Sequence, residues 1–112
     1  MSQITTHLLD TAKGKPAEGV KIVLYRQQGE AWLPAAHGAT NKDGRIADLL
    51  EKDHVLAAGV YKMEFFTGDY FDQLGLKSFY PVIPIVFEIT SAEHYHIPLL
   101  LNPFGYTTYR GS

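Results

Sequence analysis

The chain has 112 residues, of which 46% are hydrophobic and 20% charged; this is the size and composition of one globular domain, and we expect residues 1–112 to form it. Its formal net charge is −2 with acidic and basic residues interspersed, so neither nucleic acid nor an anionic membrane is expected as a partner. The chain contains no cysteine, which excludes disulfides, thiolate metal sites and cysteine nucleophiles.

The first residues show no basic stretch followed by an apolar run, so they do not have the pattern of a secretory signal. The longest apolar stretches, such as residues 80–87, are far too short to span a bilayer. We therefore expect a cytoplasmic protein, or a periplasmic one if a signal peptide has been removed.

Turn-forming residues recur every eight to twelve positions, and most of the runs between them alternate with a period of two. This pattern is typical of an all-β sandwich or barrel. It predicts about eight strands, over residues 4–10, 20–27, 31–40, 45–48, 60–66, 83–90, 95–101 and 106–109.

The breaks between these runs have recognisable turn chemistry. Asp43-Gly44 suits a turn that needs positive φ, so a turn is expected between the third and fourth runs. One short helix is expected over residues 69–76, with Asp69 as its cap and Gly75 at its end. Pro84 and Pro98 fall inside two strands and indicate edge or bulged positions.

Three polar features interrupt the apolar pattern. Thr5 and His7 share one face of the first strand, and a lone strand histidine is more often structural than catalytic. His94 and His96 also share a face, as zinc ligands can, but no third ligand accompanies them, so one is expected to be functional and the other a solvated turn residue. The aromatic, β-branched C-terminus alternates through residues 106–112 and is expected to dock in a sheet.

Together, several of these segments resemble one known family. Thr5-Thr6-His7-Leu8-Leu9-Asp10 and the terminal Tyr109-Arg110-Gly111-Ser112 resemble the two signatures of the 5-hydroxyisourate hydrolases, the transthyretin-related enzymes of urate breakdown. Residues 14–17, 40–45 and 96–100 are also similar to that family. The resemblance spans essentially the whole chain, and the terminal tetrapeptide is its most specific element.

The resemblance implies a transthyretin-like two-sheet β-sandwich whose subunits pair edge to edge into dimers. Two dimers would stack into a homotetramer with a central channel, where the active sites lie between subunits. It further implies two sets of site residues. The catalytic set is His7, Arg45, His96 and Ser112, and the substrate-binding set is Arg45, Tyr109, Arg110 and Ser112.

The family's substrate is a small oxidised purine with an acyl–nitrogen bond to be hydrolysed. A neutral imidazole suits the role of general base toward water, and we assign His7 to it with His96 as its partner, while the reverse stays open. Arg45 would stabilise the negative charge of the intermediate, and the second histidine or Ser112 would relay a proton to the leaving nitrogen. No metal or organic cofactor is required.

Two other functions fit a β-sandwich. A transthyretin-like carrier would bind a small hydrophobic ligand without chemistry, and an adhesion module would have no converging polar groups. The ionisable set His7, Arg45, His96 and Ser112 favours the hydrolase over both.

Overall fold

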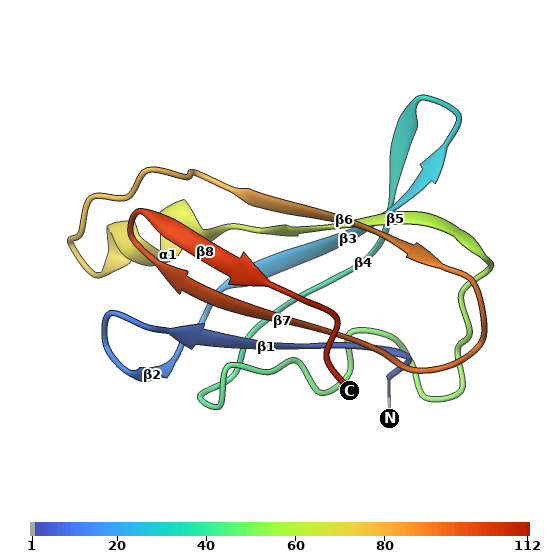
Figure 1. Cartoon of the computed structure of the whole chain (residues 1–112), viewed down its shortest axis with the longest axis horizontal. Helices are drawn as coiled ribbons and strands as arrows, with labels where there is room; N and C mark the ends of the chain where they lie inside the picture. Colours follow the sequence, from blue (N-terminus) through green and yellow to red (C-terminus); the bar gives the residue numbers. More distant parts are fainter. Residues whose placement is uncertain (1) are drawn as a thin grey trace.

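The computed structural model describes residues 2–112, which form two four-stranded sheets and one short helix (Figure 1). The strand order is β2-β1-β7-β8 in one sheet and β4-β3-β5-β6 in the other. The elements are β1 (Ile4–Asp10), β2 (Lys15–Pro16), β3 (Lys21–Gln28), β4 (Ala31–Ala39), β5 (Gly59–Phe65), α1 (Thr67–Gln73), β6 (Ile83–Ile89), β7 (Tyr95–Asn102) and β8 (Gly105–Thr108). The predicted all-β sandwich of about eight strands with one short helix is confirmed.

Alternation along the strands decides which side chains enter the core. In β3, Ile22 and Leu24 are fully buried while Lys21 is exposed. In β5, Met63 and Phe65 are fully buried in the same way. Because successive strand side chains point to opposite faces, each sheet presents one apolar face to the other.

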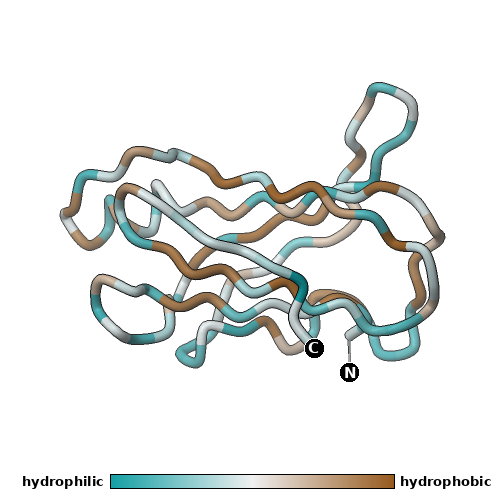
Figure 2. Tube along the Cα trace, viewed as in Figure 1, coloured by the Kyte–Doolittle hydropathy of each residue, from teal (hydrophilic) through white to brown (hydrophobic). Residues whose placement is uncertain are grey.

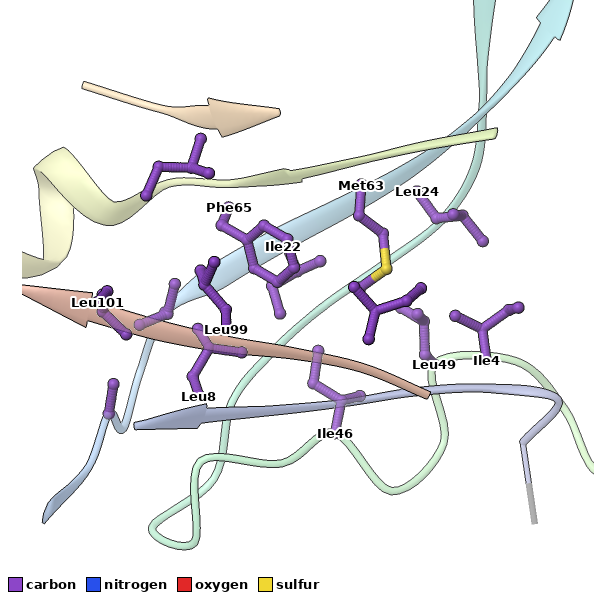
Figure 3. Close-up of a cluster of buried hydrophobic side chains, with 14 of the residues drawn as sticks. Ile4, Leu8, Ile22, Leu24, Ile46, Leu49, Met63, Phe65, Leu99 and Leu101 are labelled. Carbon is purple, nitrogen blue, oxygen red and sulfur yellow. The ribbon is translucent and has the colours of Figure 1, made fainter. Parts of the chain in front are cut away.

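The core lies between the two sheets. Figure 2 shows the hydrophobic residues concentrated along the strands, with the connecting loops mostly hydrophilic. In Figure 3, Leu8 and Leu99 from one sheet face Ile22 and Phe65 from the other. All four side chains are fully buried, so burial of apolar area is the main force that holds the sheets together.

The strand predicted over residues 45–48 is wrong. Arg45 forms only an isolated bridge with His7, and the chain then turns so that Ile46, Leu49 and Leu50 are buried in the core. Three apolar side chains within five residues cannot all reach one face of a strand. The eighth strand is instead β2, a two-residue segment that pairs with the end of β1.

The helix is also displaced from its predicted bounds. It covers Thr67–Gln73 instead of residues 69–76, and Asp69 lies in its first turn and does not cap it. Thr67 and Gly68 are buried, and the Gly68 N–H donates to the carbonyl of Pro81. This tertiary contact starts the helix without a side-chain cap. Gly75 follows the helix with a φ of +72°, so the predicted stop is confirmed.

The two strand prolines differ. Pro84 lies on β6, which is a sheet edge as predicted. The prediction for Pro98 is wrong because β7 lies between β1 and β8. On its other side β7 pairs first with β8, as far as Leu99↔Thr108, and then with the C-terminal tail at His96↔Gly111. Pro98 lies in the unpaired gap between these two contacts, so no partner there requires the N–H that proline lacks. The Thr108 hydroxyl donates to the Pro98 carbonyl at 2.7 Å across this gap.

Candidate functional site

Parallel pairing of β1 with β7 brings together residues about ninety positions apart. Thr5 is the Cα partner of His96, and His7 is the partner of Pro98. On β1, Ile4, Thr6 and Leu8 are buried, so Thr5 and His7 project from the opposite, outer face. The predicted shared face of Thr5 and His7 is confirmed, and His96 lies beside it.

Thr5 forms the centre of a histidine cluster. Its Oγ1 lies 2.8 Å from His96 Nδ1 and 2.7 Å from His94 Nε2. The two imidazole rings are stacked, with centroids 6.3 Å apart and an interplanar angle of 24°. His94 is exposed, but this hydrogen bond means that it is more than the solvated turn residue that the sequence suggested for one of the pair.

Arg45 is presented by the turn that precedes it. The Asn41 Oδ1 accepts hydrogen bonds from the N–H groups of Asp43 and Arg45, at 2.9 and 3.1 Å. Gly44 has a φ of +73°, and a Cβ there would collide with the Leu8 carbonyl oxygen, so only glycine fits this position of the turn. The Leu8 N–H donates to the Gly44 carbonyl at 2.9 Å, which ties the turn to β1.

This attachment sets Arg45 against His7. The two residues form an isolated antiparallel bridge, and Arg45 Nη2 lies 3.4 Å from His7 Nδ1. The turn sequence 41–45 therefore has a specific consequence, because it delivers a permanent positive charge to the outer face of β1.

The C-terminus is docked, as predicted. The Gly111 N–H donates to the His96 carbonyl at 2.8 Å, and the His96 ring leaves no room for a Cβ at position 111 (Figure 1 shows the C-terminus beside β1 and β7). The last strand ends at Thr108, so the expected extended face through Arg110 and Ser112 does not form. Arg110 instead pairs with Glu93 at 2.7 Å and stacks over the ring of Tyr95.

These groups surround a cleft of about 610 Å³, a volume suited to a small molecule. Of the predicted site residues, Arg45, His96, Tyr109 and Ser112 line it, while His7 contacts Arg45 beside it and Arg110 lies elsewhere. The complete lining is Thr5, Thr6, Asn41, Arg45, Ile46, Ala47, His94, His96, Tyr109, Gly111 and Ser112.

The electrostatics of the cleft favour a neutral His96. Burial is the largest cause that lowers its pKa below the ordinary 6.5, followed by the positive charge of Arg45 and then by His94 and His7. A histidine that stays unprotonated near neutral pH can accept a proton from water.

Within residues 2–112, no group of three or more His, Asp or Glu side chains is arranged to hold a metal ion. The side chains that line the cleft offer the imidazoles of His94 and His96, the guanidinium of Arg45 and hydroxyl groups as its chemical functions. That combination suits hydrolysis at a polar carbonyl compound.

Several other lining residues were not predicted as site residues, among them Thr5 and Asn41. Both lie inside segments that the sequence had singled out. Their positions in the site depend on contacts between distant segments. The β1–β7 register places Thr5 beside His96, and the bridge between Arg45 and His7 places the turn that contains Asn41 beside β1.

Comparison with known proteins agrees with this geometry. The chain matches the model of the HIUase/Transthyretin family over residues 4–111. It is 47% identical to 5-hydroxyisourate hydrolase 2 of Rhizobium meliloti (strain 1021), across 98% of this chain and 96% of that protein. The structure is similar to Klebsiella pneumoniae 5-hydroxyisourate hydrolase, with a TM-score of 0.86 and 38% identity over 97% and 98% of the two chains. It is also similar to sea bream transthyretin in complex with thyroxine, with a TM-score of 0.92 and 33% identity over 98% and 95%.

Proposed function

The chain belongs to the HIUase/Transthyretin family, and on that premise we propose that it catalyses the hydrolysis of 5-hydroxyisourate in urate catabolism, using the cleft described above. The family resemblance predicted from the sequence is thereby confirmed. The observation that carries the proposal is the position of Arg45 and Ser112 beside His96 in one cleft, with His7 against Arg45.

Backbone similarity does not separate the hydrolases from the transthyretins, because both neighbours superpose closely on this chain. Sequence and chemistry do separate them. The identity is higher to the hydrolases, and the cleft is lined by a histidine of lowered pKa and a guanidinium. A cleft that only held a hydrophobic ligand would gain nothing from lining its wall with these polar groups. The carrier alternative is therefore not favoured.

We assign the general base to His96, the reverse of the assignment that the sequence suggested. His96 lines the cleft, its pKa is lowered, and its Nδ1 is engaged by Thr5, which leaves Nε2 for water. His7 does not line the cleft and its Nδ1 faces Arg45, so it is better placed to orient the guanidinium.

The remaining groups then have complementary tasks. Attack of water on the acyl carbon places negative charge on oxygen, and Arg45 is suited to stabilise it as a permanently charged donor. Cleavage of the acyl–nitrogen bond requires a proton at nitrogen, which the protonated His96 or the Ser112 hydroxyl can deliver. Tyr109 lines the same cleft and is proposed to contact the substrate; Arg110 would do so only from a neighbouring subunit. No metal or organic cofactor enters this scheme.

We also propose that the subunits assemble as a homotetramer through their sheet edges. β6 and β8 are edge strands, and their exposed residues include Val86 on β6 and Tyr106 on β8. Unpaired edges with apolar side chains favour pairing with another chain. A tetramer would also complete the cleft, which lies open at the surface beside His7 and the C-terminus.

The single-domain organisation and the cellular location that the sequence suggested stay predictions. We propose that residues 1–112 form a single domain, supported by the one core that both sheets share. The cytoplasmic location stays a prediction. In the part of the chain that the structure describes, no helix is long and apolar enough to cross a membrane.

The proposal is tested by generating 5-hydroxyisourate and following the decay of its absorbance with and without the protein. We expect the wild-type chain to accelerate the decay and His96→Asn to lose most of that effect. Light scattering coupled to size-exclusion chromatography measures the assembly, for which four copies are expected. A decay that the wild-type protein leaves unchanged would contradict the proposed function.

A further inference from the structure

Thr5 and His94 take no part in the scheme above, yet both line the cleft. The Thr5 hydroxyl has a ring nitrogen on each side, His96 Nδ1 at 2.8 Å and His94 Nε2 at 2.7 Å. The strand register fixes this arrangement, because Thr5 and His96 are Cα partners in the parallel pairing of β1 and β7.

The hydroxyl has one hydrogen, and this limits the allowed proton positions. If both facing nitrogens were bare, the hydroxyl could satisfy only one of them, and the other would face the oxygen lone pairs. At least one of the two rings must therefore carry its hydrogen toward Thr5. The tautomer of His96 is thus linked to the hydrogen-bonding state of His94.

We propose that Thr5 is a positioning residue whose hydroxyl accepts from His96 Nδ1–H and donates to His94 Nε2, which leaves His96 Nε2 unprotonated toward the cleft. The inference rests on the proposed role of His96 as general base. In the opposite tautomer the hydrogen would sit on Nε2, and His96 could not accept a proton from water there.

The same chain of hydrogen bonds can move a proton. When His96 Nε2 takes a proton from water, its Nδ1 hydrogen can pass to Thr5 Oγ1 while the hydroxyl hydrogen passes to His94 Nε2. His96 is then neutral and the positive charge resides on His94. The reverse transfer restores His96 as the acid when the leaving nitrogen is protonated.

Charges around the cluster favour this sharing. Arg45 and His7 both act on His96 from the side of β1 and its adjoining turn, and both disfavour a positive charge on the His96 ring. His94 is exposed, so water solvates a charge there better than at the half-buried His96.

The first test needs no variant. Nitrogen-15 NMR of histidine-labelled wild-type protein distinguishes a protonated from an unprotonated ring nitrogen. We expect His96 to carry its hydrogen on Nδ1 near neutral pH, and a hydrogen on Nε2 would overturn the proposal. This measurement does not depend on turnover, so it separates failure of the inference from failure of the proposed function.

The second test compares Thr5→Val with Thr5→Ser. Valine preserves the branched shape and strand preference and removes only the hydroxyl, whereas serine keeps the hydroxyl. We expect Thr5→Val to lower kcat about tenfold or more with little change in KM, since general acid–base contributions are larger than this. We expect Thr5→Ser to recover most of the rate. Equal loss in both variants, or no loss in Thr5→Val, would overturn the proposal.

The third test asks whether His94 acts through Thr5. His94→Phe keeps a ring for stacking and removes the acceptor nitrogen. If the two residues belong to one chain of hydrogen bonds, the double variant Thr5→Val/His94→Phe should lose no more rate than Thr5→Val alone. Additive losses would show that His94 acts by another route.

Discussion

Gly111→Ala is a one-methyl change that should remove activity and leave the fold intact. A Cβ at position 111 would stand 2.5 Å from His96 Cδ2 and 3.2 Å from Pro98 Cγ, whereas ordinary contacts begin at 3.4 Å. The backbone at Gly111 does not have positive φ, so the effect would come from this collision and not from backbone strain.

The part of the molecule that yields to this collision follows from comparing its free-energy cost with the strength of the contact that holds the tail. Overpacking of this kind typically costs about 1–3 kcal/mol. The tail beyond β8 is held to β7 by the Gly111–His96 backbone hydrogen bond, which contributes about 0.5–1.5 kcal/mol. We therefore expect the tail or the His96 ring to shift by roughly 1 Å while the core keeps its packing. A displacement of that size in a catalytic site can lower a rate about a hundredfold.

The assay follows the decay of freshly generated 5-hydroxyisourate, and thermal unfolding is recorded for the same samples. Gly105→Ala is the matched control, because a Cβ there meets only the Asn102 side chain, at 3.7 Å and beyond. We expect Gly111→Ala to lose most of its rate with nearly unchanged Tm, and Gly105→Ala to keep its rate. Wild-type turnover in Gly111→Ala would refute the placement of the tail against His96.

Four other outcomes are expected. His96→Asn should lower the rate about a hundredfold or more because it removes the general base. His7→Asn should lower the rate about a hundredfold because it leaves Arg45 misplaced, whereas His37→Asn, away from the cleft, should not lower it; wild-type rates in the His7 and His96 variants would contradict the site. Arg45→Lys should lose much of the activity with Tm and assembly unchanged, since an ammonium replaces a planar guanidinium poorly; a silent substitution would make Arg45 a simple turn residue. Because the pKa of His96 is lowered, its base form should persist below pH 6.5, and kcat/KM should fall only at more acidic pH. As the pH drops below 6.5, the unfolded state binds the proton of this histidine before the folded state does, so the free energy of unfolding should decrease. This part of the pH dependence should be lost in His96→Asn. Dialysis against a strong chelator should leave the rate unchanged, and activity restored by zinc would show that a metal is needed.

Local pattern was enough to predict most of the fold. Alternation located β1 at its observed bounds and the other long strands to within one or two residues, because the core selects every second side chain on a half-buried strand. Asp43-Gly44 located the turn before Arg45, and Gly75 located the end of the helix, since both need positive φ at glycine. Motifs at the two ends of the chain identified the family, because they are contiguous in sequence.

Where contacts come from distant parts of the chain, the local pattern failed. Residues 45–48 have a strand-like composition, but the core takes Ile46 and Leu49 and leaves only the bridge at Arg45. Pro98 looks like an edge residue, yet it occupies an interior strand because the tail leaves a gap opposite it.

The candidate site shows the same division. Its residue types were evident from the sequence, as histidines and an arginine within motifs. Their relation to one another was not, because Thr5 and His96 meet only through a parallel pairing of strands at opposite ends of the chain. The hydrogen bonds of Thr5 follow from that pairing, and the approach of Gly111 to His96 follows from the antiparallel bridge between the C-terminal tail and β7. Sequence specifies which groups are available, and the register between distant strands decides which of them share a proton.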